Sequence, residues 1–253
     1  MAKINVYNID GSIKTTVNLP EIFDTPYRPD IIQKSFNALH ANQRQPYGAS
    51  PAAGMSHATA SVGKGRGMSR VPRLTQGRQA ALAPCVVGGR RAHPPKAERN
   101  WYEKVNKKEK QLARNSALAA TAIKEIVQER GHILNKDVTL PIIVDDKFEQ
   151  LSKTKDVIQA LEKIGVYDDV LRSTNGKHIR AGRGKNRGRK YRIPKSILII
   201  TTKDPIQKSS HNLSGIDVTN PSQLNIEHLA PGGVAGRLTI VTKSALTLIG
   251  GAE

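Results

Sequence analysis

Lysine and arginine residues gather in two stretches that contain no carboxylate. The first lies between Asp30 and Glu98 and carries ten cations, and the second runs from Val170 to Lys203 and carries eleven. The whole chain has 40 Lys and Arg against 21 Asp and Glu, so the remaining sequence is close to neutral. Clustered cations of this kind bind polyanions, and arginine in particular makes bidentate hydrogen bonds to phosphate. The sequence therefore predicts two polyanion-binding segments, with nucleic acid as the default partner.

The first stretch contains a long segment whose composition does not suit a folded core. Residues 45–100 hold eight Gly and six Pro, and their large apolar residues are isolated, so no helix or sheet could bury a face there. Loops of this length are usually functional or disordered. We therefore predict an extended internal arm at 45–100. The cations expected to bind RNA from this arm are Arg44, Lys64, Arg66, Arg70, Arg73, Arg78, Arg90, Arg91, Lys96 and Arg99.

The second stretch predicts a basic loop at residues 173–195 in which Gly and Arg alternate. The glycine clusters at 63–67 and 182–185 resemble phosphate loops, but neither lies between a predicted strand and helix, and neither has a nucleotide-binding spacing. Interleaved Gly and Arg instead suit a flexible backbone laid against RNA phosphates. The cations expected to bind RNA from this loop are Lys177, Arg180, Arg183, Lys185, Arg187, Arg189, Lys190 and Arg192.

Other residues with possible chemistry have simpler structural interpretations. The histidines are scattered without a Cys pair or closely spaced carboxylates, so we predict no metal site and no cofactor. Asp145 and Asp146 follow a predicted strand, where a nuclease could place a general base or a magnesium ligand, but an exposed turn or a helix start is the simpler interpretation. Cys85 has no plausible catalytic partner nearby in sequence and is interpreted as a small apolar residue.

An aromatic pair closes the arm. Trp101 and Tyr102 follow Arg99 and could stack on a base or on arginine, or could pack at the start of the next helix. Aromatic residues make up only 4% of the chain, which argues against a stacking platform for single strands. We therefore expect contacts mainly to phosphate and sugar.

An anionic membrane is the weaker alternative partner. The longest aliphatic runs, Ile197–Ile200 and Ile142–Val144, are far shorter than the roughly 20 residues of a spanning helix. Gly and Pro interrupt both basic stretches every few residues, which argues against amphipathic surface helices. The single cysteine fits a reducing compartment. We therefore predict a protein without a membrane partner.

The N-terminal part of the chain predicts a hairpin and a helix before the arm. Lys3–Asn8 alternates apolar and polar residues, residues 10–11 suit a tight turn, and Ser12–Leu19 can form the returning strand. Pro29 begins a short amphipathic helix that should end near Ala41.

After the arm we predict one long helix, capped by Asn106 and ended by Gly131. The face expected to be buried comprises Leu112, Ser116, Ala119, Ala120, Ile123, Ile126 and Val127.

The rest of the sequence alternates short apolar runs with helical patterns. Strands are predicted at Leu140–Val144, Ser196–Thr201, Gly215–Val218 and Leu238–Val241, and helices at about 157–164, Ser222–Leu229 and Lys243–Ile249. This alternation predicts an α/β fold, with a mostly parallel sheet flanked by helices on both faces. Residues 1–44 and 101–253 should form a single globular domain, into which the arm is inserted.

Three ordered motifs carry a resemblance to a known family. Residues 65–73 read GRGMSRVPR, residues 88–96 read GGRRAHPPK and residues 115–121 read NSALAAT, and YRIPKSIL follows at 191–198. The chain resembles the large-subunit ribosomal protein four family of archaeal type over essentially its whole length. Compared with the eukaryotic form, Val62 stands where a Trp precedes the glycine-arginine run, and the long basic C-terminal tail is absent, which supports the archaeal type.

The resemblance implies a non-enzymatic constituent of the large ribosomal subunit in the cytoplasm. Its partners would be large-subunit rRNA, neighbouring ribosomal proteins, and the nascent peptide near the arm tip, which would line the wall of the exit tunnel. The second loop would bind rRNA near the globular domain and help the subunit to fold. Carried over by motif, the tunnel-proximal tip comprises Gly63, Gly65, Arg66, Gly67, Met68, Arg70 and Arg73.

Two other classes of protein are alternatives. An RNA-processing enzyme on an α/β scaffold would need clustered acids or a cofactor loop at the strand ends, whereas the acids of this chain are spread over the core. A DNA-binding protein is harder to exclude, because charge alone does not distinguish duplex DNA from RNA.

Overall fold

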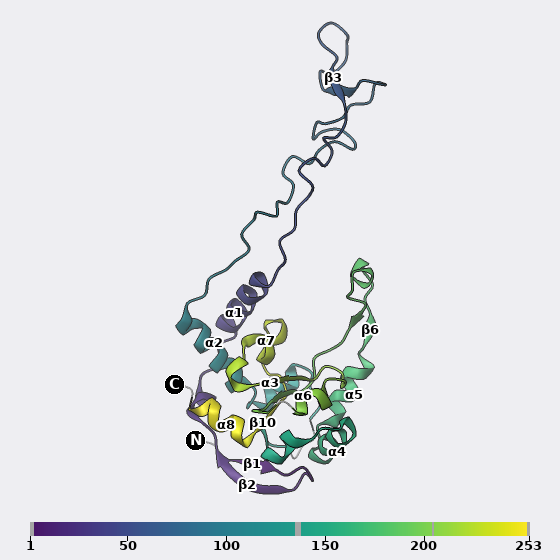
Figure 1. Ribbon diagram of the computed structural model, residues 1–253. Helices are drawn as coiled ribbons and strands as arrows, with labels where there is room; N and C mark the ends of the chain where they lie inside the picture. Colours follow the sequence, from purple (N-terminus) through teal and green to yellow (C-terminus); the bar gives the residue numbers. More distant parts are fainter. Residues whose placement is uncertain (1–2, 135–137, 204, 252–253) are drawn as a thin grey trace. The chain divides into compact units, whose positions relative to one another are not determined.

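The computed structural model describes residues 3–134, 138–203 and 205–251 (Figure 1). The chain divides into two compact units. One contains the residues up to His40 and those from Lys104 onward, and the other is Ala41–Glu103. Both hydrophobic core clusters belong to the first unit, which has the α/β architecture and is described here.

A six-stranded sheet with the order β2-β1-β5-β10-β8-β9 forms the centre of this unit. The pairs β1–β5, β5–β10, β10–β8 and β8–β9 are parallel, and only β2 runs antiparallel to its neighbour β1. The predicted α/β fold with a mostly parallel sheet is confirmed. The strands are β1 (Lys3–Tyr7), β2 (Ile13–Asn18), β5 (Ile142–Val144), β8 (Leu198–Ile200), β9 (Asp217–Thr219) and β10 (Thr239–Thr242).

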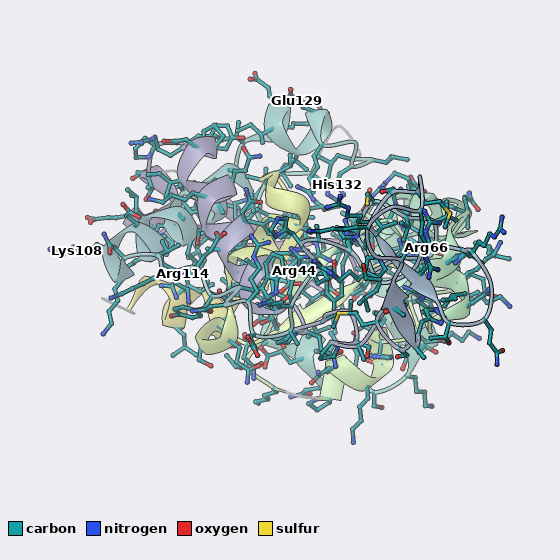
Figure 2. All side chains as sticks on the ribbon, turned by 90° about the horizontal axis from the view of Figure 1, so that it is seen from above. Arg44, Arg66, Lys108, Arg114, Glu129 and His132 are labelled. Atoms are coloured by element: carbon teal, nitrogen blue, oxygen red, sulfur yellow. The ribbon has the colours of Figure 1, made fainter. Side chains whose placement is uncertain are left out.

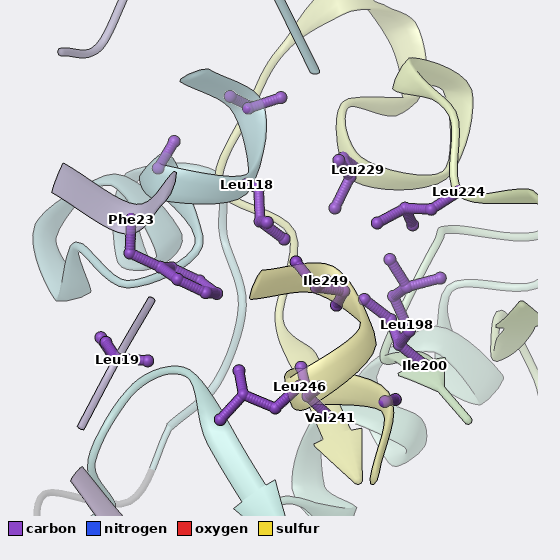
Figure 3. Packing of buried hydrophobic residues seen from close by; sticks show 14 of the residues in the cluster. Leu19, Phe23, Leu118, Leu198, Ile200, Leu224, Leu229, Val241, Leu246 and Ile249 are labelled. Atoms are coloured by element: carbon purple, nitrogen blue, oxygen red, sulfur yellow. The ribbon is translucent and has the colours of Figure 1, made fainter. Parts of the chain in front are cut away.

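The central strands are buried on both faces. In and beside β8, Leu198 and Ile200 belong to one core cluster, and Ile197 and Ile199 belong to the other. This division follows from the alternation of side chains along a strand, and it explains why these strands are continuous apolar runs. Figure 3 shows residues of the first cluster, in which Leu198, Ile200 and Val241 from the sheet lie beside Leu246 and Ile249 of α8.

Helices cover both faces of the sheet, as predicted. The first cluster includes residues of α1, α2, α7 and α8, and the second includes residues of α3, α4, α5 and α6. No helix among the described residues is long and apolar enough to cross a membrane. The helices are α1 (Pro29–Asn42), α2 (Lys107–Ala120), α3 (Lys124–Glu129), α4 (Thr154–Ile164), α5 (Tyr167–Asn175), α6 (Pro205–Ser210), α7 (Ile226–Leu229) and α8 (Lys243–Gly250), with 3₁₀ turns η1 (Glu21–Asp24), η2 (Asp146–Gln150), η3 (Arg183–Asn186), η4 (Pro221–Gln223) and η5 (Pro231–Gly233).

The predicted N-terminal hairpin is confirmed, and its turn depends on Gly11. This residue has φ +77°, and a Cβ there would lie 2.3 Å from the carbonyl oxygen of Lys163 at the end of α4. The turn therefore needs glycine both for its backbone conformation and for its close approach to α4. The helix predicted at about 157–164 is also confirmed as α4, and Gly165 follows it in the left-handed conformation at φ 85°.

The prediction of one long helix over 106–131 was wrong, because the chain forms α2 and α3 with a break between them. Thr121 ends α2, where its hydroxyl donates to the carbonyl of Leu118 at 2.6 Å. Ile123 is extended, with φ −92° and ψ 109°. The buried face also differs, since Leu112 and Ile123 are exposed whereas Ala113 and Ala117 are buried. The break has a packing reason: α2 lies in the first core cluster, and Val127 of α3 reaches the second.

Other elements were missed or divided differently. The sequence pattern did not predict α5 or α6. The helix expected at Ser222–Leu229 is two pieces, η4 and α7, because Leu224 between them is extended. The side chain of Asn225 then caps α7 by accepting hydrogen bonds from the amides of Glu227 and His228.

A buried ionic cluster ties the segment after α3 to α5. The carboxylate of Asp169 is fully buried, lies 2.9 Å from Nδ1 of His132 and 2.8 Å from Nε of Arg172, and accepts a hydrogen bond from the amide of Ile133 at 3.0 Å. Burial by itself raises the pKa of Asp169, but the hydrogen bonds from His132 and Arg172 outweigh burial and hold this pKa below its usual range. The folded protein is therefore stabilised by the ionised form of Asp169.

We expect Asp169→Asn to lower the free energy of unfolding at pH 7 by about 3 kcal/mol, because Arg172 and His132 lose their buried anion. Since the folded pKa of Asp169 is depressed, its contribution is present above the unfolded pKa of about 4 and is lost as the pH falls through the folded value. Urea unfolding followed by circular dichroism should therefore show that the difference between variant and parent narrows at acid pH.

The matched control for this prediction is Asp10→Asn, which removes an exposed ion pair with Lys163. Exposed pairs contribute little to stability, so this variant should unfold like the parent. A loss of stability for Asp169→Asn that is the same at pH 7 and at pH 3 would contradict a role for the ionised carboxylate.

Candidate nucleic-acid interface

The unit Ala41–Glu103 has almost no hydrophobic core. Among its residues, all of which the structure describes, Ala81 is the only buried one. Of the ten cations predicted in the arm, Arg73 and Arg90 are half-buried and the other eight are exposed. No carboxylate within the described residues forms an ion pair with any of these ten cations. The unit is therefore held together by backbone and polar contacts, and its positive charge is not neutralised internally.

Two glycines let the outgoing and returning limbs of the arm approach closely. The amide of Ala49 donates to the carbonyl of Pro95 at 3.0 Å, and a Cβ on Gly48 would lie 2.6 Å from the amide nitrogen of Ala97. Further along, Gly54 has φ +74°, and a Cβ there would lie 2.7 Å from Cα of Arg90. A side chain at either position would push the limbs apart.

The ends of this unit are joined at Asn42 and Glu103. The Asn42 side chain donates to the carbonyl of Glu103 at 3.1 Å and accepts from the amide of Glu103 at 2.7 Å. Beside this pair, the guanidinium carbons of Arg44 and Arg99 lie 4.0 and 4.2 Å from the ring centroid of Trp101. The contact of Trp101 with arginine is thus one of the predicted alternatives that the structure bears out, and it joins one arginine from each limb to a single ring.

All of the predicted tip residues except Arg73 lie in the connection of a small hairpin. Strands β3 (Thr59–Ser61) and β4 (Pro72–Leu74) pair antiparallel, and residues 62–71 connect them. This hairpin was not predicted; backbone hydrogen bonds form it without a buried side-chain face. Gly63, Gly65 and Gly67 all have positive φ, and a Cβ on any of them would meet no atom within 4 Å, so the connection is open on that side.

Most tip side chains are free to contact a partner, but Arg73 also braces the hairpin. Lys64, Arg66, Met68 and Arg70 are exposed, and Arg66 is marked in Figure 2. Arg73 lies in β4, and its guanidinium donates to the carbonyls of Arg78 at 2.7 Å and Ser69 at 3.4 Å.

A basic concavity in the arm includes a residue that the sequence analysis missed. Its volume is about 460 Å³, and its lining combines three of the predicted cations with aromatic and imidazole rings and no carboxylate. The missed residue is Tyr47, an isolated aromatic in the Gly- and Pro-rich segment, and that isolation was the available signal. The lining residues are Tyr47, Arg91, His93, Pro94, Pro95, Lys96 and Arg99.

The second basic loop belongs to the α/β unit and is a hairpin of its own. Strands β6 (His178–Ile179) and β7 (Tyr191–Arg192) pair antiparallel, and η3 lies between them. The structure brings all eight predicted cations of this loop together, and each is exposed. Nζ of Lys177 and Nζ of Lys190 lie 4.8 and 5.4 Å from the ring centroid of Tyr191. Within the described residues, no carboxylate forms an ion pair with any of the eight cations.

The base of this hairpin is fixed to the core. The hydroxyl of Ser173 donates to the carbonyl of Pro194 at 2.6 Å, and Arg172 donates to the carbonyl of Lys195 at 2.8 Å. Next in sequence, the carbonyl of Ser196 accepts from Nε of the fully buried Arg237 at 2.9 Å. Lys195 and Arg237 both pair with Asp217, at 2.8 and 2.7 Å. The neutralised cations thus lie at the base, and the unneutralised ones lie in the hairpin.

The two aspartates considered for the alternative of a nuclease form contacts within the fold. Asp145 pairs with Lys14 at 2.9 Å, and Asp146 accepts a hydrogen bond from the amide of Ser244 at 2.8 Å. Across the described residues, no group of three His, Cys, Asp or Glu side chains could hold a metal ion. Cys85, interpreted as a small apolar residue, is exposed, because it lies in the arm, where there is almost no core to bury it.

The fold and the charge distribution define a class: an α/β protein whose surplus positive charge lies in two core-free segments. A sequence profile of the ribosomal protein L4/L1 family matches residues 17–252. The chain is 51% identical to large ribosomal subunit protein uL4 of Haloquadratum walsbyi, with 95% of this chain and 96% of the relative covered. It is also 51% identical to the uL4 protein of Methanocaldococcus jannaschii, with 96% of each chain covered, and 46% identical to that of Archaeoglobus fulgidus, with 98% of each covered.

This chain belongs to the ribosomal protein L4/L1 family. The resemblance stated from the motifs is confirmed, as is its archaeal type, since the three relatives are archaeal proteins. Membership of this family of structural proteins also confirms the prediction that the chain is not an enzyme.

We expect Trp101→Leu to loosen the ends of the arm, because two cation–π contacts of about 0.5–1 kcal/mol each are lost. Limited trypsin digestion should then cut after Arg44 or Arg99 about tenfold faster, since more of the chain is transiently open to the protease. The control is Tyr102→Leu, which removes an exposed neighbouring aromatic. Equal cleavage rates for Trp101→Leu and the parent would show that the ring does not fasten the two limbs.

Proposed function

We propose that this protein is a structural constituent of the large ribosomal subunit, located in the cytoplasm, that binds large-subunit rRNA and supports its folding and assembly. One observation carries the proposal: eighteen predicted RNA-binding cations lie on two core-free segments and have no ion-pair partner among the described residues. The names of the relatives, large ribosomal subunit protein uL4, support the same assembly.

The chemistry of these segments suits an RNA backbone. Exposed arginine and lysine release counterions when they neutralise phosphates, and this release is the main sequence-independent source of affinity for nucleic acid. Arginine can also bind phosphate in a bidentate manner or stack on a base, so the Gly- and Arg-rich hairpins can follow an irregular RNA surface. The concavity with Tyr47 adds an aromatic ring beside Arg91 and Arg99, which suits one nucleotide.

The two segments would have different tasks. The arm at 45–100 would extend into the rRNA, with the tip Gly63–Arg73 at the wall of the nascent-peptide exit tunnel, where the peptide would pass close to it. The loop at 173–195 would bind rRNA near the globular domain formed by residues 1–44 and 101–253, and this domain would meet neighbouring ribosomal proteins. The open glycine connection and exposed cations of the tip support this arrangement, as does the motif GRGMSRVPR.

Replacing Arg183, Arg187 and Arg189 together with Ala should weaken binding to purified large-subunit rRNA. If each arginine contacts one phosphate, the slope of log K against log salt should become shallower by about 0.7–0.9 per arginine. Filter binding over a salt series measures this slope. The matched control replaces Lys147, Lys153 and Lys155, three exposed cations outside both segments, and should leave the slope near that of the parent. A triple arginine variant with the slope of the parent would refute this role of the loop.

Replacing residues 60–75 with a short Gly-Ser linker should remove protein density from the tunnel wall, because this segment contains the tip hairpin. Electron cryomicroscopy of large subunits assembled with the shortened protein checks the assignment. Density at the tunnel wall that matches the parent would show that another part of the subunit occupies this place. Incorporation of the shortened protein is the control, since the second loop is intact in it.

A further inference from the structure

Two adjoining cavities open along α2 in the α/β unit, and residues outside both basic segments line them. Their volumes are about 360 and 450 Å³, and both are lined by Arg114, Ser222 and Leu224. Thr202 and Asn220, which follow β8 and β9, line the first cavity. This place therefore lies beyond the carboxyl ends of two parallel strands, where open α/β sheets present their binding crevices. We call the two cavities together the α2 groove.

The floor of the α2 groove is aliphatic. Leu118 belongs to α2, Leu224 follows η4, and Ile249 belongs to α8. Their side chains point toward one another in Figure 3. All three are buried, and they belong to the first core cluster, so the floor is rigid. At the rim, Leu248 is 56% exposed although it lines the cavity. An apolar side chain of a partner would bury this rim and cover the floor, which favours binding.

One wall of the groove is positively charged. Lys107, Lys110 and Arg114 line the second cavity and follow one another at spacings of three and four residues, so they lie along one side of α2. The adjoining side of the helix, with Ala113 and Ala117, is buried in the core. Figure 2 marks Arg114 on this helix.

These three cations lack a carboxylate partner among the described residues. Neither cavity has an acidic residue in its lining. The one carboxylate in the first turn of α2, Glu109, pairs with Lys34 at 2.9 Å. The α2 groove thus combines an aliphatic pocket with three unneutralised cations, and the rRNA-binding segments use none of its residues.

We propose that the α2 groove docks an acidic peptide segment of another protein. An apolar side chain of that segment enters the pocket above Leu118 and Ile249, and its carboxylates pair with Lys107, Lys110 and Arg114. This groove would be a protein-binding surface of the proposed ribosomal constituent. Only the location of the partner, in the large subunit, rests on the proposed function. RNA fits the groove less well, because the floor is aliphatic and the lining offers no aromatic ring on which a base could stack.

The first test uses the isolated full-length protein and a defined probe. The probe is a fluorescein-labelled twelve-residue peptide in which Leu and Glu each recur every three to four residues, so that they form separate faces of a helix. The fluorescence anisotropy of the peptide reports binding. Arg114→Glu and Leu248→Asp should each weaken binding about tenfold, by reversing one charge of the wall or by placing a carboxylate at the apolar rim. The control Lys155→Glu makes the same charge change on α4, outside the groove, and should bind like the parent.

A second probe separates the pocket from the charge. A peptide with every Leu replaced by Ala keeps all carboxylates, and it should bind about tenfold more weakly because it cannot fill the aliphatic floor. Equal binding of the two peptides, or equal weakening by Arg114→Glu and Lys155→Glu, would overturn the proposal, since either result reduces the interaction to general attraction between a basic protein and an acidic peptide.

The third measurement identifies the occupant in the assembled particle. Leu248 is replaced by the photoreactive p-benzoylphenylalanine, large subunits containing this protein are irradiated, and the cross-linked product is analysed by mass spectrometry. The expected product is a peptide of another protein with carboxylates beside an apolar residue. A cross-link to nucleotides, or no macromolecular cross-link at all, would overturn the proposal. Failure of the protein to enter subunits would instead count against the proposed function, and the peptide measurements would still decide the role of the groove.

Discussion

Unneutralised positive charge is the constraint on which the rest of this structure depends. Eighteen cations lie on segments with no carboxylate partner among the described residues, so mutual repulsion opposes compaction of these segments. Local fastenings replace a core: close backbone contact at Gly48 and Gly54 in the arm, and the pairing of Asn42 with Glu103. The α/β unit, by contrast, uses its carboxylates at structural positions such as Asp169 and Asp217. Charge separation within one chain thus divides the protein into a part that folds by burial and parts suited to an external anion.

The sheet supports the second basic hairpin through buried polar contacts. Two hydrogen bonds hold the base of the hairpin. The hydroxyl of Ser173, before the hairpin, donates to the carbonyl of Pro194, after it, and Arg237 donates to the carbonyl of Ser196, where the chain enters β8. Because Arg237 is fully buried and pairs with Asp217, the strand β9 and the base of the hairpin share one ion pair. A fixed base would reduce the conformational entropy that the hairpin loses on binding the proposed RNA partner, and this reduction would increase affinity without any additional contact.

Sequence patterns predicted the elements that are apolar and regular, and failed where tertiary contacts decide the structure. The strands β5 and β8 are continuous apolar runs, and α4 is followed by a glycine, so these elements were predictable. The break at Thr121 was not, because it serves two separate cores. For the candidate site, counting charges located both segments, whereas the hairpin β3–β4 rests on backbone bonds that leave no pattern. The α2 groove has no sequence signal, since the fold assembles it from residues between Ile22 and Ile249.

The strand order has a consequence for the synthesis of the chain. Strand β10 lies between β5 and β8 in the sheet, yet it is the last strand in the described part of the chain, at Thr239–Thr242. A ribosome adds residues from the N-terminus onward, so both basic segments are complete while the centre of the sheet is still missing. During that interval the cations are attached to a chain without its native core, and any polyanion nearby can bind them before the α/β unit folds. The topology therefore makes the order of translation, and not only the final affinity, a determinant of which polyanion the two basic segments would meet first.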